Sequence, residues 1–480
     1  MTKPMIETAK LEFSLSPALD PQWLKENLPR YMWHEHETPA EIVQLDILNI
    51  WKSSKRVTVL YEIGLNGSNA PVRQQMYVGY VVPSDHLFVE YQKMFEKAKT
   101  QPAVGRAVTL IPEAEMYLLT FPNDRKMSLL SGAGLQAWLA EHLREVAGDE
   151  LDGTRWQIQQ AEVEPLRYVP EKRFTARCRV IIKCEHGPNQ EISFIAKQMG
   201  DEKKAKRLYR NLRSLRKAWA GSGGDSRSRS NARLSIRLPR ALAIDEKNAI
   251  VYLEDLPGIN LKQALGEIDL KRVMPAAGKL LANLHLTKKR VHKKVSIRNE
   301  VLEVREIMGM IVAAFPALKP RLKAFFEKFK TVRWDDKVPP VLLHGTYRLN
   351  HIFIHGNELA LLDMDSIRVG HPAYDIANFL SSLYYLEAQK RIRAPLRQNI
   401  ARHFLKGYAA QAPWVIPPAA VLWFLSSLLI NKQAGKYVAH FHEDREEKVN
   451  RMLALAEATL ALCRQTPKGL TLTGLWKALP

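Results

Sequence analysis

Residues 342–367 read LLHGTYRLNHIFIHGNELALLDMDSI and combine a polar loop with two short apolar strands. The loop begins at His344 and Gly345, and the second strand leads into two carboxylates, Asp363 and Asp365. If this strand continues through both acids, their side chains lie on the same face, because residues i and i+2 of a strand point the same way. Paired carboxylates hold hard cations through oxygen. The stretch therefore predicts a cleft in which two acids face a metal ion.

The motif around this stretch resembles a known family. Residues 344–380 follow the pattern HGxxxxxxIxIxxxxxxLLDxDxxxxGxPAYDIANFL, which is similar to the aminoglycoside and choline phosphotransferase superfamily of kinase-like enzymes. The similarity is strongest over 341–380 and extends weakly back to about residue 161. It implies an α+β, protein-kinase-like fold with a β-rich N-lobe and a helical C-lobe. It also implies ATP as the phosphate donor and Mg²⁺ as the metal.

The resemblance assigns roles to individual acids of the loop region. Asp363 would be the principal metal ligand, and Asp365 would be a supporting one. Asp375, which lies near the start of the next helix, would brace the backbone of the loop. These three assignments are implied by the family and not by the spacing of the acids alone.

The resemblance also implies a nucleotide site upstream. Lys197, in the strand ISFIAKQM, would contact the α- and β-phosphates, and the linker strand AIVYLEDLPG, which contains Glu254 and Leu256, would cradle the adenine. No glycine-rich loop precedes Lys197, so the turn YVPEKRF would take its place. The lysine also lacks the usual helix glutamate, since Glu202 follows closely and no acid occurs between Lys203 and Gly224.

Two positions of the loop depart from the family. Thr346 stands where the family has an aspartate that orients and deprotonates the acceptor hydroxyl, and a threonine cannot be an anionic base at neutral pH. His351 stands where the family has a metal-binding asparagine, with Asn350 one position early. A neutral imidazole is a poor ligand for Mg²⁺. The magnesium site is therefore incomplete unless Asn350 turns inward.

Two functions remain open after these departures. The first is an ATP-dependent phosphotransferase that acts on a hydroxyl or amine of an unidentified small molecule, with His344, Thr346 and Asp365 as the candidate catalytic residues. Loss of a general base costs about 10²- to 10⁴-fold, whereas positioning and metal electrostatics supply most of the acceleration in phosphoryl transfer. The alternative is a pseudokinase, a non-catalytic protein that binds nucleotide or serves as a scaffold.

A repeated β pattern precedes the loop region. At an offset of 117 residues, KRVTVLYEI at 55–63 aligns with KRFTARCRV at 172–180, and QMYVGY at 75–80 aligns with ISFIAK at 192–197. This alignment places Tyr80 over Lys197. We interpret it as a duplication of one small β-rich lobe, with two unrelated meanders of similar alternation as the alternative.

The expected secondary structure then changes from mainly β-strands to mainly helices. From about residue 259, apolar residues recur at three- and four-residue spacing, which is typical of amphipathic helices. A flexible polar insertion contains GSGGDSRSRSN. We predict an N-terminal α+β domain at 1–160, an N-lobe at 161–258 with the insertion at 221–235, a C-lobe at 259–465 with its catalytic region at 341–380, and a tail at 466–480.

Charge and cysteine content limit the partners and the compartment. The 480 residues carry 71 Lys and Arg against 50 Asp and Glu, for a net charge of +21, so the surface attracts anions. Besides nucleotide, we expect an anionic small molecule or protein as a partner; nucleic acid is not favoured, because no recognition motif accompanies the charge. Three cysteines without a CxxC pair fit a reducing cytoplasm. No transmembrane segment is expected, because the longest apolar run, at 419–430, is too short.

Overall fold

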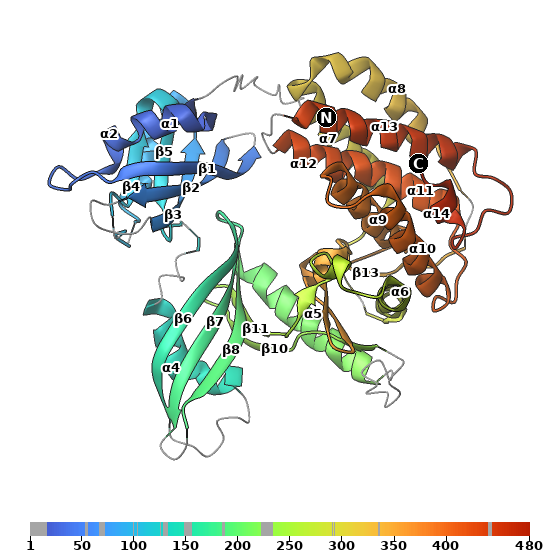
Figure 1. Cartoon of the computed structure of the whole chain (residues 1–480), viewed down its shortest axis with the longest axis horizontal. Helices are drawn as coiled ribbons and strands as arrows, with labels where there is room; N and C mark the ends of the chain where they lie inside the picture. The colour runs from blue at the N-terminus through green and yellow to red at the C-terminus, as the bar shows by residue number, and fades with distance from the viewer. Residues whose placement is uncertain are drawn as a thin grey trace, which may run out of the picture. The chain divides into compact units, whose positions relative to one another are not determined.

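The structure is a computed structural model of the whole chain, with a β-rich first part and a helical second part (Figure 1). This is the α+β architecture that the sequence predicts. The polar insertion predicted at 221–235 falls largely outside the residues that the structure describes. These are 17–52, 56–66, 73–98, 100–102, 104–124, 126–127, 133–147, 156–184, 188–221, 234–289, 291, 293–334, 337–439 and 444–480.

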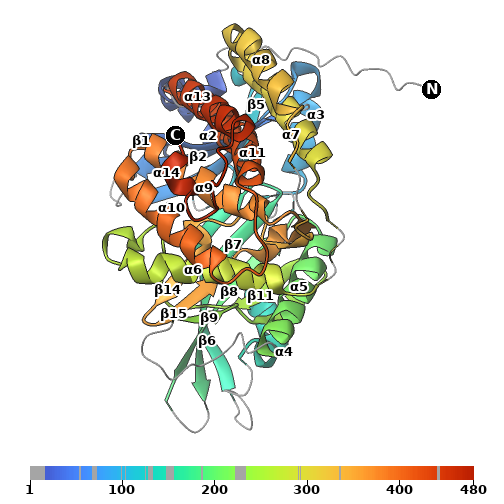
Figure 2. The same cartoon turned by 90° about the vertical axis from the view of Figure 1, so that its right-hand side faces the viewer.

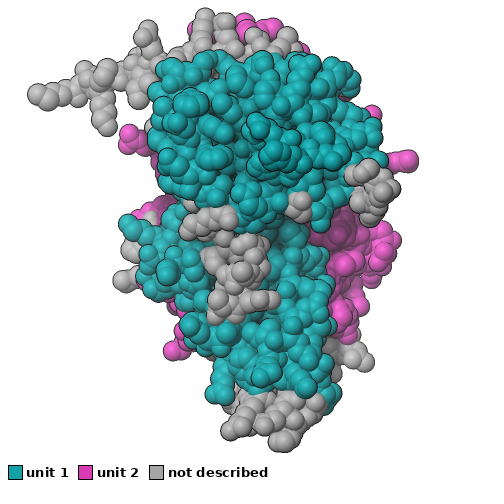
Figure 3. All heavy atoms as spheres, turned by 90° about the vertical axis from the view of Figure 1, so that its left-hand side faces the viewer, with its two compact units in different colours: residues 1–206, 242–252 teal, residues 207–241, 253–480 magenta. Residues whose placement is uncertain are grey.

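The chain divides into two compact units, which are coloured separately in Figure 3. One unit contains residues 1–206 and 242–252, and the other contains 207–241 and 253–480. The predicted boundary at 160 does not separate the units. The reason is a shared core, because Tyr168, Phe174 and Ala176 pack into the same buried cluster as residues of the first β-sheet.

The first sheet has five strands in the order β1-β2-β3-β5-β4. Its two faces are both covered, by α1 and α2 on one side and by α3 on the other, through two separate apolar clusters. Burial on both faces explains why its central strands are nearly continuous in apolar residues. The elements are α1 Pro21–Asn27, α2 Pro29–Met32, β1 Glu41–Lys52, β2 Val57–Asn66, β3 Arg73–Val81, α3 Ser84–Phe95, β4 Val108–Ile111 and β5 Met116–Thr120.

The second sheet has the order β6-β7-β8-β11-β10. Helix α4 packs on it through a cluster that includes Leu139, Leu143 and Phe194 (Figure 1). A long basic helix, α5, follows β8. The elements are α4 Ala133–Ala147, β6 Trp156–Val169, β7 Arg173–Cys184, β8 Gln190–Met199, α5 Glu202–Gly221, β10 Ala241–Asp245 and β11 Ile250–Glu254.

The two sheets share a topology. In each, three antiparallel strands in sequence are followed by a helix and by two further strands that pair in reversed order. The register also agrees, because Thr58 pairs with Tyr80 in the first sheet and Thr175 pairs with Lys197 in the second, at the offset of 117. This agreement supports the duplication that the repeat suggests.

The second unit is mostly helical and carries short β-hairpins. Figure 2 shows α6 and α10 side by side. The helices are α6 Leu270–Leu286, α7 Ile297–Ala314, α8 Lys319–Phe329, α9 Ala373–Ala388, α10 Ala394–Ala409, α11 Pro418–Leu428, α12 Gly435–Ala439, α13 Arg445–Arg464 and α14 Leu475–Ala478, with a π-helix at Leu429–Ala434. The strands are β9 Ser235–Arg237, β12 Ile259–Asn260, β13 Val341–Leu343, β14 Ile352–His355, β15 Glu358–Leu361 and β16 Arg368–Gly370.

The predicted C-terminal tail is part of this unit and packs on its helices. The carbonyl oxygen of Pro480 accepts hydrogen bonds from the Tyr384 hydroxyl at 2.7 Å and from the Arg397 guanidinium at 2.9 Å. The apolar run at 419–430 forms α11 and the start of the π-helix, and it is buried. None of the helices seen in the described residues combines the length and hydropathy that a bilayer crossing needs.

Candidate active site

The loop after β13 is held by the carboxylate of Asp375, at the start of α9. Its Oδ2 accepts a hydrogen bond from the backbone N–H of His344 at 2.6 Å, and its Oδ1 accepts one from Gly345 at 2.8 Å. Burial would raise the pKa of this carboxyl, but hydrogen bonding and charge from His285, with the N–H of Gly345, hold the pKa below its ordinary value. The side chain is therefore an ionised clamp on the loop.

Helices α6 and α10 position the group behind this clamp. A Cβ at Gly278 would lie 2.2 Å from a backbone oxygen of α10, and one at Gly407 would lie 2.1 Å from a backbone oxygen of α6. Only glycine permits so close an approach. The contact brings Nδ1 of His285 to 2.8 Å from the Tyr408 hydroxyl, while Nε2 of the same ring lies 3.3 Å from Asp375.

Gly345 is required by its backbone conformation and its surroundings. Its φ is +83°, and a Cβ at this position would lie 2.5 Å from the carbonyl oxygen of Ser366. Its own carbonyl oxygen accepts hydrogen bonds from Nδ2 of Asn378 at 3.1 Å and from Nζ of Lys432 at 3.0 Å. Both the N–H and the C=O of this glycine are thus fixed by polar side chains.

His344 supports the loop through both of its ring nitrogens. Nε2 lies 2.9 Å from the carbonyl oxygen of Leu362, which can only accept, so Nε2 carries the proton. Burial lowers the pKa of His344, which favours the neutral ring. Nδ1 then accepts from the backbone N–H and the hydroxyl of Thr346, both at 3.3 Å. The Thr346 hydroxyl is therefore oriented by the loop, and its lone pairs stay available.

Asp363 does not lie in a strand. Strand β15 ends at Leu361, and Met364–Ser366 forms a 3-10 turn, so the expectation that an extended strand aligns Asp363 with Asp365 is wrong. Asp363 instead adopts left-handed backbone angles of φ 61° and ψ 50°, which are uncommon outside glycine and occur at functional sites. This turn brings Oδ2 of Asp363 to 3.3 Å from Nε2 of His351.

The donors present only partly fit a magnesium ion. The structure places the carboxylate of Asp363 beside His351, but Nε2 of His351 also accepts from Nε of Arg348 at 3.0 Å. Asn350, the predicted alternative ligand, is exposed. Among the described residues, no group of three or more His, Cys, Asp and Glu is arranged to hold a metal. One or two carboxylates together with nucleotide phosphates are a common Mg²⁺ environment, so Asp363 and Asp365 fit a nucleotide-bound ion.

The candidate nucleotide residues lie on two elements. Lys197 is on β8 in the first unit and is 7% exposed. In the second unit, the carboxylate of Glu254 forms ion pairs with Arg237 and Arg240, and Leu256 is buried. The Glu254 side chain is thus engaged in ion pairs. Only the backbone of this linker therefore remains a candidate for adenine binding.

The sequence alone did not single out Lys432. This residue lies in the π-helix, and its Nζ is 3.1 Å from Oδ1 of Asn378 in addition to its contact with the loop. Lys436 follows it at the next helical turn and donates to Gln433 at 2.9 Å. In the sequence, the two lysines stand in NKQAGK, directly after a run of apolar residues. Burial of a cation beside such a run costs free energy, so its presence there is a sign of function.

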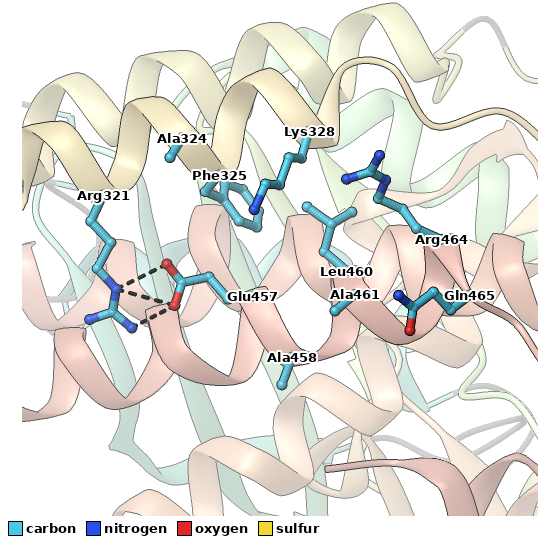
Figure 4. Close-up of a pocket in the computed structure, with 10 residues that line it drawn as sticks. All are labelled: Arg321, Ala324, Phe325, Lys328, Glu457, Ala458, Leu460, Ala461, Arg464 and Gln465. Atoms are coloured by element: carbon cyan, nitrogen blue, oxygen red, sulfur yellow. Dashed lines mark hydrogen bonds and ion pairs between the residues drawn. The ribbon is translucent and has the colours of Figure 1, made fainter.

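A cavity of about 650 Å³ lies elsewhere in the second unit, between α8 and α13. Figure 4 shows that Arg321 turns toward Glu457 across it, at 2.6 Å, while Phe325 and Leu460 line its apolar part. None of the predicted site residues lines this cavity. The candidate site therefore rests on the loop geometry.

Comparisons with known proteins agree with this assignment. Residues 229–414 match the model of the phosphotransferase enzyme family, a stretch that covers less than half of the chain. It contains the loop, Asp363, Asp375 and the linker at Glu254, but neither Lys197 nor Lys432. A comparison with curated proteins finds no significant match.

Several solved structures are similar to the chain at low identity. Amicoumacin kinase hAmiN in complex with AMP-PNP, Ca²⁺ and Ami is 16% identical, covers 62% of this chain and 87% of its own, and has a TM-score of 0.41. Choline kinase from Cryptosporidium parvum Iowa II is 14% identical over 64% of this chain and 91% of its own, with a TM-score of 0.42. Macrolide 2'-phosphotransferase MphH from Brachybacterium faecium is 16% identical over 68% and 97%, with a TM-score of 0.38.

The family match falls on the same residues that carry the motif in the sequence. It includes the whole of the His-Gly loop, the acids that follow it and the helix that begins with Asp375. The resemblance agrees with this match: residues 229–414 are similar to the phosphotransferase enzyme family, and the chain has the mixed α+β architecture that the resemblance implies.

Proposed function

We propose that the protein is an ATP-dependent phosphotransferase that acts on a hydroxyl or amine of a small molecule. The observation that carries the proposal is the Asp375 clamp, which fixes two successive N–H groups of the loop at 2.6 and 2.8 Å. Phosphoryl transfer depends on positioning and electrostatics more than on covalent chemistry. A loop held this firmly supports a site that must place an acceptor accurately.

The remaining parts follow from the residues around the loop. Lys197 is assigned to the α- and β-phosphates, and the backbone near Glu254 and Leu256 to the adenine. Asp363 and Asp365 would hold Mg²⁺, which neutralises charge on the phosphates when it is bound. Because Asp363 lies beside His351 of the loop, a metal held there and the acceptor would share one site.

Thr346 orients the acceptor in this proposal. Its hydroxyl hydrogen is directed at Nδ1 of His344, so its oxygen can accept a hydrogen bond from an acceptor O–H. The acceptor oxygen forms a bond to the γ-phosphorus, the bond from that phosphorus to the β-phosphate oxygen breaks, ADP leaves, and the acceptor proton passes to solvent. A loose transition state needs little removal of that proton before the bond forms.

The proposal places the protein in the cytoplasm. The two cysteines whose side chains the structure describes, Cys178 and Cys463, are free and buried. Free thiols persist in a reducing compartment, where ATP is also supplied.

Calorimetric titration of ATP tests the proposal, with and without Mg²⁺ or Mn²⁺. We expect metal-dependent binding that Lys197→Ala and Asp363→Asn each weaken by about tenfold or more, because each removes a charge-assisted contact. Matched controls are Lys183→Ala on β7 and Glu327→Gln on α8, which are exposed. Absence of ATP binding under every condition would reject the proposal. Binding without turnover on any acceptor would instead identify a pseudokinase.

A further inference from the structure

Two cations flank the loop on which the proposed acceptor would lie. Lys432 donates to the carbonyl oxygen of Gly345, and Arg368 is also close, because a Cβ at Gly345 would be 2.8 Å from its Nε. Both cations face the ring of Tyr374, at 5.3 Å for Lys432 and 5.7 Å for Arg368. Two positive groups thus lie near one buried aromatic ring and beside Gly345, the residue before Thr346.

An irregular helix presents Lys432 to the loop. Residues Leu429–Ala434 form a π-helix between α11 and α12. Such segments interrupt regular helices at a cost in stability and are frequent at functional sites. Here the interruption directs Lys432 toward Gly345 and Asn378, although the helix before it is buried and apolar. The deformation therefore serves to place a cation at the loop.

The acids near these cations are already engaged. Glu300 on α7 is buried and accepts hydrogen bonds from Ser427 at 2.9 Å and from Asn431 at 3.2 Å. Asp375 is committed to the loop backbone and to His285. Within the part of the chain that the structure describes, neither acid forms an ion pair with Lys432 or Arg368, so the donors of these two side chains are not taken up by either carboxylate.

Burial and neighbouring arginines lower the pKa values of several lysines in this region. Burial and the charge of Arg368 lower the pKa of Lys432 to about 8, and burial with Arg348 lowers the pKa of Lys436 to about 7. The charge of Arg368 is also the largest cause that lowers the pKa of Lys293. A bound anion would relieve this repulsion, because an opposite charge favours the charged form of each lysine.

We propose that the acceptor is anionic and that Lys432 and Arg368 bind its phosphate or carboxylate group beside Thr346. This inference rests on the proposed phosphotransferase function and names the substrate class of the same site. Both side chains are partly exposed, so a ligand can reach them. The guanidinium offers a planar pair of donors and the ammonium a compact charge, which together suit a tetrahedral or planar oxyanion.

Titration with small charged and neutral ligands tests the proposal. The full chain is saturated with Mg²⁺ and AMP-PNP, which occupies the nucleotide site, and is then titrated with glycerol 3-phosphate, glycerate, glycerol and choline. We expect both anions to bind at least about tenfold more tightly than glycerol or choline, because charge-assisted hydrogen bonds replace neutral ones. The ratio between glycerol 3-phosphate and glycerate shows whether phosphate or carboxylate is preferred.

Substitutions assign the anion site to named residues. Lys432→Gln and Arg368→Gln are each expected to lower the affinity for glycerol 3-phosphate by about tenfold. Lys328 is an exposed lysine on α8, and Lys328→Gln should leave this affinity unchanged. Thermal melts identify any variant that fails to fold. If one of the two substitutions prevents folding, the affinity of the other variant tests the proposal. Equal affinity for glycerol and glycerol 3-phosphate, or equal effects of Lys432→Gln and Lys328→Gln, would overturn the proposal.

Failure of the two proposals can be told apart. If AMP-PNP does not bind but the free protein binds inorganic phosphate in a manner that depends on Lys432, the phosphotransferase function fails and the anion site stands. If AMP-PNP binds and the anions do not, the function stands and the anionic acceptor is overturned.

Discussion

The two β-sheets of the first unit have the same strand order but hold different residues at one matched position. Tyr80 and Lys197 occupy equivalent places in the register, each opposite a threonine. Even the turns agree, because Glu115 and Ala249, which precede the last strand of each sheet, both have left-handed backbone angles, at φ 46° and 55°. One topology therefore carries a buried aromatic ring in one copy and a cation in the other.

The difference shows how such a lobe can lose or keep a phosphate site. Tyr80 stacks on Tyr117 at 5.1 Å, and the guanidinium of Arg56 lies 4.6 Å from its ring centroid. Arg56 also forms an ion pair with Glu171 at 2.8 Å. These contacts fill the position around Tyr80 with protein atoms. The first sheet is therefore expected to act in stability alone, and the second sheet is expected to bind nucleotide.

Truncation of Tyr80 should have the largest effect on stability. Tyr80→Ala removes a fully buried ring and should lower the free energy of unfolding by about 3–5 kcal/mol, with ATP affinity unchanged. Tyr80→Phe is the matched control and should be close to neutral, because the buried hydroxyl of Tyr80 has no hydrogen-bond partner among the described residues. Urea unfolding measures both variants. A loss of ATP affinity in Tyr80→Ala that exceeds its loss of folded protein would contradict the division of roles.

The reciprocal change in the second sheet should affect binding. Lys197→Tyr makes this position like that of the first sheet and should weaken ATP binding roughly 10- to 100-fold, since a charge-assisted contact to phosphate is lost. Lys183→Tyr, on the exposed side of the neighbouring strand, is the control. Calorimetry compares the two. Unchanged affinity in Lys197→Tyr would show that the two sheets do not differ in the way we infer.

Introduction of an acid at Thr346 tests whether the loop can support catalysis. Thr346→Asp should raise ATP hydrolysis about tenfold or more, because general base assistance is regained. Thr346→Asn has nearly the same shape without the charge and should leave the rate unchanged. Release of ADP is measured in a coupled assay. The same rate in the two variants would argue that the acceptor approaches the loop differently.

The smallest expected effect is a dependence of anion binding on pH. The pKa of Lys436 is lowered to about 7 and that of Lys432 to about 8, so both lose positive charge as pH rises from 6 to 9. Burial raises the pKa of Glu300 to about 7, so this acid gains negative charge over the same interval. All three changes weaken anion binding. The other charged groups near these lysines are Glu303 on α7, Asp375 on α9, Arg348 and Arg368.

Affinity for glycerol 3-phosphate should therefore fall several-fold between pH 6 and 9, with the sign fixed by loss of lysine charge. Lys436→Gln should remove the lower part of this decline and leave the part near pH 8. Titration at constant ionic strength measures the profile. Affinity that rises with pH would contradict the assignment of these lysines. It would also contradict the proposal that the loop binds an anionic acceptor.

Much of this organisation could be predicted from the sequence. The offset of 117 aligned Tyr80 with Lys197, and the structure places them at matched register because the same offset applies to both strands of each antiparallel pair. The loop motif pointed to a phosphotransferase family, which residues 229–414 match, and to an α+β architecture, which the structure has. The division into units was predicted less well, because the shared core around Phe174 depends on contacts between sheets that no local pattern encodes.

The details of the site depended on contacts distant in sequence. The apolar run before Asp363 suggested a strand that continues through it, but the left-handed backbone of Asp363 prevents this. An aspartate in such a conformation cannot be recognised from the pattern of apolar residues. Lys432 lies far along the chain from Gly345, and its position follows from a π-helix that helical spacing does not predict. The structure was therefore needed to connect the loop with its cations.

The two glycines at which α6 touches α10 also limit how this chain can vary by inheritance. Every single-nucleotide change in a glycine codon that specifies a different amino acid adds at least a Cβ. At Gly278 or Gly407, such an atom would lie 2.1 to 2.2 Å from a backbone oxygen of the facing helix, so the helices would have to separate and His285 would move away from Asp375. A heritable change at either position is therefore expected to disturb the loop, although it alters no residue of the loop itself.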